Sequence, residues 1–219
     1  MRKVVIIGAR PDGHAKVVLE IIQAGTEFLV AGFVDDRLFG TDLVIRGIPV
    51  IGTVADLPFL RDTFGLYGAI VAIGDNAARR NLGNRVRKSG LTLVNAIHPT
   101  VHLDTGVTVG EGNCLCQGVI IVTGTTIGDS VNIHTGATVD HDNVIGDGAN
   151  LGPGVHTAGR VQIGRDAFLG AGTIVIPDCS VGEGAITGAG TVVIDPVEPY
   201  CKVVGVPARI IERINKPSI

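Results

Sequence analysis

A six-residue repeat that runs without interruption through the second half constrains this sequence more than any other feature. Read in sixes, residues 101 to 196 form sixteen consecutive hexads with no insertion. The first place of each hexad holds Val, Ala, Thr, Asn or Cys, and the third place is aliphatic in fourteen of the sixteen. Such a regular pattern indicates a solenoid, in which the chain winds into stacked coils around an aliphatic core.

The two apolar rows indicate the shape of a coil. Places one and three lie two residues apart, so both side chains point to the same side of a short strand. Three strand-plus-turn units make a triangular coil of eighteen residues, and sixteen hexads give a little over five coils. Other β-solenoids and propellers are disfavoured because no longer unit overlies the six-residue period. We expect the frequent fourth-place glycines to serve turns with positive φ; they are Gly110, Gly128, Gly146, Gly152, Gly164, Gly170, Gly182 and Gly188.

The first 97 residues instead alternate strand and helix patterns. The expected elements, in chain order, are a strand Lys3–Ile7, a helix Ala15–Ala24, a strand Leu29–Val34, a Gly/Pro-marked stretch over 47–52, a helix near Val54–Phe64, a strand Ala69–Ile73, a helix Ala77–Lys88 and a strand Thr92–Ala96. This order predicts an α/β domain with a Rossmann-like parallel sheet. The predicted domains are therefore residues 1–97 and 98–219.

Polar loops follow three of these strands. The loop Gly8–Gly13 leads into His14, the second strand ends at Asp35-Asp36, and the third is followed by Gly74. Ligands of parallel sheets bind beyond the carboxyl ends of the strands, so these loops are predicted to meet at one site. The glycine loop can offer backbone N–H groups to a diphosphate. NAD is a weak reading because Arg10 replaces the middle glycine of the dinucleotide fingerprint, and a plain strand–helix turn remains an equal alternative.

Composition excludes several classes of partner. The formal net charge is −3 and no run of Lys or Arg occurs, so we expect no nucleic acid. No apolar run approaches the roughly 20 residues that cross a bilayer, so we expect no membrane association. The four cysteines lack paired CxxC spacing, and we interpret them as reduced thiols of a cytoplasmic protein.

The combined motifs resemble one family along the whole chain. They are Gly-x-x-x-x-Gly-His, Asp-Asp, Ile-Gly-Asp-Asn, His-Pro before the hexads, and a terminal Gly-Val-Pro-Ala-Arg. They are similar to those of the nucleotide-aminosugar acetyltransferases with hexapeptide repeats, a group that contains sialic acid and bacillosamine-pathway enzymes. The resemblance implies a left-handed parallel β-helix, a homotrimer, acetyl-CoA as co-substrate in the groove between neighbouring prisms, and a place in lipopolysaccharide O-antigen biosynthesis.

The resemblance also implies the chemistry of the repeat. Acetyl transfer to an amine needs a group that takes the released proton, and histidine suits this role near neutral pH. The catalytic pair of the family, a histidine followed by an acidic residue, corresponds to His141 and Asp142, with Asp in place of the usual Glu. His141 occupies the fifth, outward place of its hexad. Composition alone would make it a solvated turn residue.

The remaining site residues follow from the same resemblance. The nucleotide-sugar site is expected at Asp12, Gly13, His14, Asp35, Asp36 and Gly74. Acetyl-CoA contacts are expected at Asn150, Ala171 and Ala189. His134 and His156 either line the groove or are simply exposed. A zinc site of the trimeric carbonic-anhydrase kind needs two histidines five residues apart, and no such pair exists, so no metal is expected.

Three functions remain open from the sequence. The leading one is acetylation of the 4-amino group of a nucleotide-linked deoxy sugar, with His141 as general base. The second is acetyl transfer to a hydroxyl, as on a sialic acid. The third is a nucleotide-sugar-binding scaffold whose prism only trimerises. The sequence does not distinguish guanine from uracil nucleotides.

Overall fold

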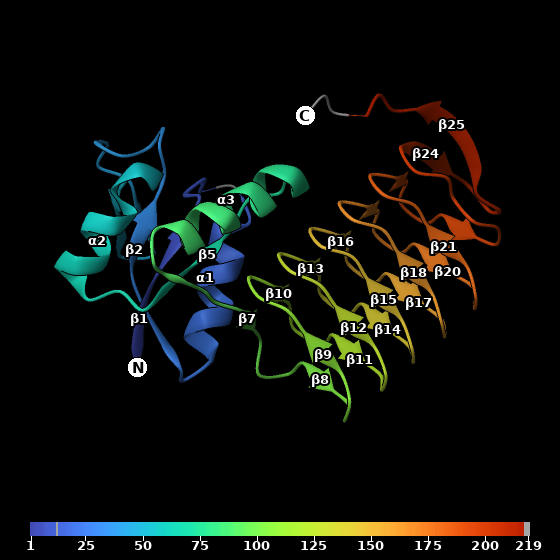
Figure 1. Ribbon diagram of the computed structural model, residues 1–219, viewed down its shortest axis with the longest axis horizontal. Helices are drawn as coiled ribbons and strands as arrows, with labels where there is room; N and C mark the ends of the chain where they lie inside the picture. Colours follow the sequence, from blue (N-terminus) through green and yellow to red (C-terminus); the bar gives the residue numbers. More distant parts are fainter. Residues whose placement is uncertain (12, 217–219) are drawn as a thin grey trace. The chain divides into compact units, whose positions relative to one another are not determined.

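The computed structural model describes residues 1–11 and 13–216 (Figure 1). The chain divides into two compact units, residues 1–99 and the residues from Thr100 onward. The first unit is an α/β domain and the second is a left-handed parallel β-helix, as the sequence predicts.

The first unit is built on a sheet with the strand order β3-β4-β2-β1-β5-β6. Its elements are β1 (Arg2–Ile7), α1 (Ala15–Ala24), β2 (Phe28–Val34), β3 (Val44–Ile45), β4 (Ile48–Gly52), the 3₁₀ turn η1 (Val54–Asp56), α2 (Leu57–Phe64), β5 (Gly68–Val71), α3 (Asn76–Lys88), β6 (Thr92–Leu93) and β7 (Ala96–Ile97). Strand β1 lies at the centre and pairs in parallel with β2 and β5. Residues Val4–Ile7 are almost completely buried, which explains the continuous apolar run that marks this strand.

One part of the first unit differs from the sequence interpretation. The stretch marked by Gly47 and Pro49 contains strands, not only a turn. Strand β4 pairs in parallel with β2, and β3 folds back antiparallel to β4 through Arg46 and Gly47, both at positive φ. The pattern was missed because β3 spans only two residues and Pro49 lies inside β4, which is tolerated near the edge of a sheet.

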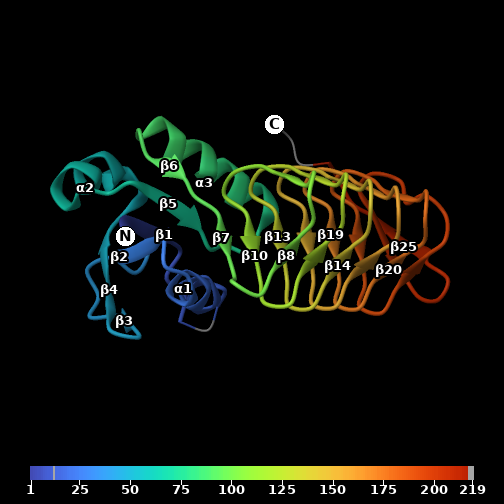
Figure 2. The ribbon, with the colours of Figure 1, turned by 90° about the horizontal axis from the view of Figure 1, so that it is seen from below.

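The second unit is a stack of two-residue strands in three sheets (Figure 2). Each strand occupies places two and three of a hexad. They are β8 (His102–Leu103), β9 (Thr108–Val109), β10 (Cys114–Leu115), β11 (Ile120–Ile121), β12 (Thr126–Ile127), β13 (Asn132–Ile133), β14 (Thr138–Val139), β15 (Val144–Ile145), β16 (Asn150–Leu151), β17 (His156–Thr157), β18 (Gln162–Ile163), β19 (Phe168–Leu169), β20 (Ile174–Val175), β21 (Ser180–Val181), β22 (Ile186–Thr187) and β23 (Val192–Val193). Strands β24 (Cys201–Val204) and β25 (Arg209–Arg213) form an antiparallel pair after the last coil.

The register confirms the eighteen-residue coil. Ile121 pairs with Val139, which is eighteen positions further along the chain, and the same offset recurs through all three sheets. The first-place and third-place side chains fill the interior from Asn113 onward, with exposures of at most 6%. The first coil departs from this rule, because Leu103 is 38% exposed.

The expected role of the fourth-place glycines is wrong. Positive φ occurs at the sixth place, in glycines such as Gly136 and Gly154 and in the non-glycine residues Asp142 and Arg160. The fourth-place glycines are needed for close packing instead. A Cβ on Gly146 would lie 2.7 Å from the backbone nitrogen of Arg165 in the next coil, a distance that side chains do not adopt. A side chain at these glycine positions would therefore collide with the next coil, whereas other fourth places, such as Val122, Asp140 and Ala158, carry side chains.

Candidate active site

The first unit contains a cleft of about 800 Å³ at the carboxyl ends of β1, β2 and β5. Five of the six residues predicted to bind the nucleotide sugar line it: Gly13, His14, Asp35, Asp36 and Gly74. Asp12, the sixth, lies outside the described residues. The three polar loops singled out in the sequence are therefore brought together at one cavity of the size of a nucleotide site.

The two aspartates after β2 have different surroundings. The Asp35 carboxylate accepts hydrogen bonds from the backbone N–H groups of Ala9, Arg37 and Leu38, at 2.9, 3.0 and 3.2 Å. It therefore ties the glycine loop to the turn after β2. In Asp36, Oδ1 accepts from the backbone N–H of Val54 at 2.7 Å, and no hydrogen bond of its Oδ2 occurs among residues 1–11 and 13–216. Of the two, Asp36 is better placed to meet a ligand.

Three arginines near the cleft were not predicted as site residues. Arg10 and Arg37 line it and supply positive charge beside the glycine loop. Arg79 is completely buried, and its guanidinium donates to the carbonyls of Ile73 and Gly74 and to Asn76 Oδ1. It thus fixes the turn that carries Gly74. Arg79 lies on the buried face of α3, and it was missed because the search for helices follows apolar residues only.

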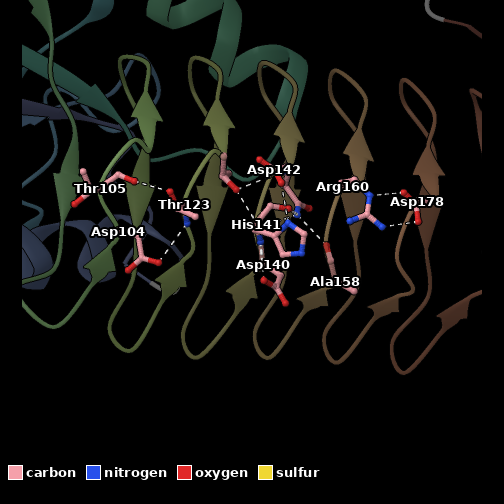
Figure 3. A network of polar contacts seen from close by, with 11 residues as sticks. Asp104, Thr105, Thr123, Asp140, His141, Asp142, Ala158, Arg160 and Asp178 are labelled. Atoms are coloured by element: carbon pink, nitrogen blue, oxygen red, sulfur yellow. Dashed lines mark hydrogen bonds and ion pairs between the residues drawn. The ribbon is translucent and has the colours of Figure 1, made fainter.

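In the second unit, His141 and Asp142 lie at a corner of the coil between β14 and β15 (Figure 3). His141 Nδ1 and Asp142 Oδ2 are 2.8 Å apart, so the carboxylate accepts the Nδ1–H of the neutral imidazole and leaves Nε2 as the basic nitrogen. The two side chains are 41% and 60% exposed. Asp142 has a φ of 56°, the left-handed conformation found at other sixth places.

A buried asparagine supports this corner. Asn143 is completely buried, and its amide nitrogen donates to the carbonyls of Asp140, His141 and Ala158, at 2.8, 3.1 and 2.8 Å. Asp140 Oδ1 in turn accepts from the backbone N–H of His141 at 2.7 Å. These bonds hold the backbone that carries the imidazole. The sequence offered one sign of this role, an asparagine in an interior row of small and β-branched residues.

An ion pair continues along the same corner of the next coils (Figure 3). The Arg160 guanidinium donates to both carboxylate oxygens of Asp178, with Nε–Oδ1 and Nη2–Oδ2 distances of 2.6 and 2.8 Å. The hydrogen bonds from Arg160 hold the pKa of Asp178 below its usual value. Arg160 lies eighteen residues after Asp142, so the arginine occupies the position directly above that carboxylate in the stack.

The residues predicted to contact acetyl-CoA are divided between two environments. Ala171 and Ala189 are exposed at fifth places of successive coils. Asn150 is only 4% exposed, on β16, although it precedes the same edge of the prism. One sheet, β23-β20-β17-β14-β11-β8, separates the edge of Ala171 from the edge of His141. Its strand β20 follows the turn that contains Ala171, and its strand β14 leads into the turn that contains His141.

The two histidines for which a place in the groove was left open, His134 and His156, have different surroundings. His156 lies on β17 of this sheet, and its Nδ1 is 2.8 Å from the hydroxyl of Thr138. His134 directly follows β13 and interacts with the buried Cys116. Hydrogen bonds from Cys114 and then from His134 lower the pKa of the buried Cys116 thiol to about 5. All four cysteines are free and buried, as expected of reduced thiols.

Residues 1–11 and 13–216 contain neither a candidate membrane span nor a candidate metal-binding cluster. No helix there has the length and apolarity that a membrane span requires. No group of three or more His, Cys, Asp and Glu side chains there is arranged to hold a metal ion.

The left-handed β-helix and the histidine at its corner, His141, are the features of the hexapeptide-repeat class of acyltransferases. Residues 160–195 match the family model of the bacterial transferase hexapeptide (six repeats), and residues 3–86 match the PglD N-terminal domain. PerB from Caulobacter crescentus, solved in complex with CoA and GDP-perosamine, is 43% identical, with 97% of this chain and 98% of that chain covered and a TM-score of 0.90. The H141A and H141N variants of that GDP-perosamine N-acetyltransferase have also been solved with both ligands.

Two further relatives act in related chemistry. The acetyltransferase domain of PglB from Neisseria gonorrhoeae, solved with acetyl coenzyme A, is 31% identical over 96% of this chain and 99% of that chain, with a TM-score of 0.87. UDP-N-acetylbacillosamine N-acetyltransferase from Bacillus subtilis is 32% identical over 123 residues, which are 52% of this chain and about half (51%) of that relative's length. The chain belongs to the family of hexapeptide-repeat nucleotide-aminosugar N-acetyltransferases.

Proposed function

We propose that the protein transfers the acetyl group of acetyl-CoA to the 4-amino group of a nucleotide-linked amino-deoxy sugar, with GDP-perosamine as the substrate. The observation that carries this proposal is the likeness over 97% of the chain to an enzyme solved with CoA and GDP-perosamine, combined with the His141–Asp142 pair. The same corner, without that likeness, would be compatible with a solvated turn.

In the proposed reaction His141 is the general base. Asp142 holds the proton on Nδ1, so Nε2 accepts a proton from the sugar amine as the amine nitrogen attacks the thioester carbonyl carbon. The tetrahedral intermediate then collapses, the carbon–sulfur bond breaks, and the imidazolium returns the proton to the departing CoA thiolate. No covalent intermediate with the enzyme is needed, because bringing the two bound substrates together supplies much of the rate.

The two substrates are proposed to bind through different units. The nucleotide occupies the cleft of the first unit, where Arg10 and Arg37 can meet the diphosphate and Gly13, His14, Asp36 and Gly74 line the wall. Asp35 holds the glycine loop through its hydrogen bond with the Ala9 N–H, and Asp12 remains a proposed contact outside the described residues. The pantetheine arm passes Ala171 and Ala189, whose small side chains permit close approach, with Asn150 beside them. The groove is completed by a neighbouring prism of a homotrimer.

The decisive experiment replaces His141. We predict that His141→Asn lowers kcat by about 1,000-fold, because removal of a general base costs on the order of 10²–10⁴. Calorimetry of CoA and GDP-perosamine binding and the mass measured by light scattering should be unchanged. Undiminished turnover of His141→Asn would remove this residue from the mechanism.

One substrate series separates the alternatives. GDP-perosamine, a UDP-linked 4-amino sugar and a free sialic acid are compared by kcat/KM, and we expect the GDP-linked amine to be highest. The UDP-linked sugar is the second candidate, because the Bacillus subtilis relative is named for a UDP-linked substrate. Preference for the sialic acid hydroxyl, or nucleotide binding without any acetyl-CoA binding, would contradict the proposed activity.

A further inference from the structure

The imidazole of His141 packs against a glycine of the next coil. A Cβ added to Gly159 would lie 2.6 Å from His141 Cε1 and 3.1 Å from Cδ2, and nearer still to Nε2. Contacts below about 3 Å are not formed by real Cβ atoms, so any side chain at this position would require the ring to move. The ring therefore occupies the space that a side chain at position 159 would take.

Neither a positive φ nor contact with the backbone of the next coil explains why residue 159 is glycine. Gly159 is not among the glycines with positive φ, so an L-residue can adopt its backbone. It is also not a fourth-place glycine, whose Cβ would meet the backbone of the neighbouring coil. Gly159 stands at a fifth place, and the other fifth places along this corner carry side chains: Thr105, Thr123, His141, Pro177 and Asp195. What a Cβ at 159 would meet is the imidazole of His141.

We propose that Gly159 is a positioning residue for the acetyl transfer, an inference that rests on the proposed function of His141. The ring is held at two points. Asp142 fixes Nδ1 from one side, and the bare Cα of Gly159 supports the edge that carries Nε2. A methyl group at 159 would displace Nε2 from the acceptor amine or break the bond to Asp142, while the backbone stays as it is.

The test is Gly159→Ala. A displacement of about 1 Å can cost on the order of 100-fold in rate, so we expect kcat to fall about 100-fold with the KM values of both substrates unchanged. Pro177→Ala is the matched control, because residue 177 occupies the same place of the hexad one coil further on, and we expect it to keep wild-type kcat. A Gly159→Ala protein that lost CoA binding or its wild-type oligomeric state would contradict a positioning role.

A double-variant cycle distinguishes positioning from any other role. With alanine at 141 the ring is absent and its space is free, so adding Gly159→Ala to His141→Ala should change kcat and thermal midpoint no further. A renewed loss of the same size in this background would show that the glycine acts without the imidazole, and would overturn the inference. Wild-type kcat in the single Gly159→Ala variant would do so as well.

The failure of this inference can be told apart from failure of the proposed function. If the wild-type protein acetylates the amino sugar and His141→Ala does not, the function stands whatever Gly159→Ala does. If His141→Ala retains full activity, the function assigned to His141 fails first. Thermal stability is informative in either case. The clash with the ring should lower the thermal midpoint of Gly159→Ala, and this loss should disappear when residue 141 is alanine.

Discussion

At the residue scale, the candidate catalytic pair is fitted between two glycines. Gly159, one coil after His141, leaves room for the imidazole, and Gly124, one coil before Asp142, leaves room for the carboxylate. A Cβ on Gly124 would lie 3.3 Å from Asp142 Cγ and closer to Oδ1. The short side chain of aspartate reaches Nδ1 at 2.8 Å from a left-handed backbone, so the usual glutamate is not required for this contact.

Arg160 lies one coil above Asp142, and its guanidinium donates to both carboxylate oxygens of Asp178. We predict that Asp178→Asn lowers kcat about tenfold, because the freed guanidinium turns to Asp142 and competes for its carboxylate, a loss typical of removing an outer hydrogen-bonding partner. Adding Arg160→Ala should restore the rate. Steady-state kinetics of the single and double variants check this; a double variant as slow as Asp178→Asn would refute the competition.

Cys116 gives a pH dependence of stability. Its pKa is lowered from 9.0 to about 5, so between these values the unfolded state binds more protons, and the contribution of the thiolate is complete above pH 9 and lost as pH falls towards 5. We predict that the difference in unfolding free energy between wild type and Cys116→Ala grows from pH 6 to pH 8, by up to about 1.4 kcal/mol per pH unit. Urea titrations measure it.

A second buried thiol provides the control for this measurement. Burial raises the pKa of Cys179, so its protonation does not change between pH 6 and 8 in either state. Cys179→Ala should therefore differ from wild type by a constant amount over that range. Parallel pH profiles for Cys116→Ala and Cys179→Ala would contradict the low pKa of Cys116.

At the element scale, the coil depends on two kinds of glycine that the sequence pattern does not separate. Gly146 faces the backbone of the next coil, whereas Gly136 has open space around its Cα and a φ of 69°. Aspartates already adopt the same left-handed conformation at sixth places, as at Asp166 and Asp178. Of these two glycines, only Gly146 lies where any side chain would meet the backbone of the next coil.

This difference predicts opposite outcomes for two substitutions. Gly146→Ala should destabilise the fold by about 3 kcal/mol or more, since overpacking a rigid contact typically costs roughly 1–3 kcal/mol and here the contact is backbone. Gly136→Asn should change stability by less than about 0.5 kcal/mol, because asparagine tolerates left-handed φ at an exposed site. Chemical denaturation compares the two, and equal costs would refute the different roles assigned to Gly146 and Gly136.

The sequence predicted the elements that rest on periodicity and missed those that rest on contacts between coils or loops. Interior rows at places one and three follow from a period of six, and the helix Ala15–Ala24 from apolar spacing. Gly159 and Arg79 could not be found in this way, because their partners, the imidazole of His141 and the carbonyls of Ile73 and Gly74, are defined only once the chain is folded.

At the scale of the whole molecule, two units of different architecture each carry candidate residues for one substrate. The cleft lies entirely within residues 1–99, and the proposed acetyl-CoA contacts lie entirely within the β-helix. A division of this kind predicts that changes in one unit alter the binding of one substrate and leave the other unaffected.

Two substitutions test this division. Asp36→Asn keeps the acceptor for the Val54 N–H and removes the charge, and we predict about a tenfold higher KM for the nucleotide sugar, as expected when a charged hydrogen bond worth roughly 1.5–3 kcal/mol is weakened. Ala189→Leu should raise the KM for acetyl-CoA by a similar factor by filling the exposed edge. Each variant should keep the wild-type KM for the other substrate, and a crossed effect would contradict separate sites.

The uninterrupted register of the prism restricts how such a gene can change in length. Inserting a single hexad between His141 and Ala171 would rotate every later strand onto the neighbouring face, so that the edge carrying Ala171 and Ala189 would no longer flank the face next to His141. Duplicating a complete coil preserves all three faces and only lengthens the column. Relatives of this chain are therefore expected to differ in length by complete coils, and insertions of any other length are expected to form loops at the corners.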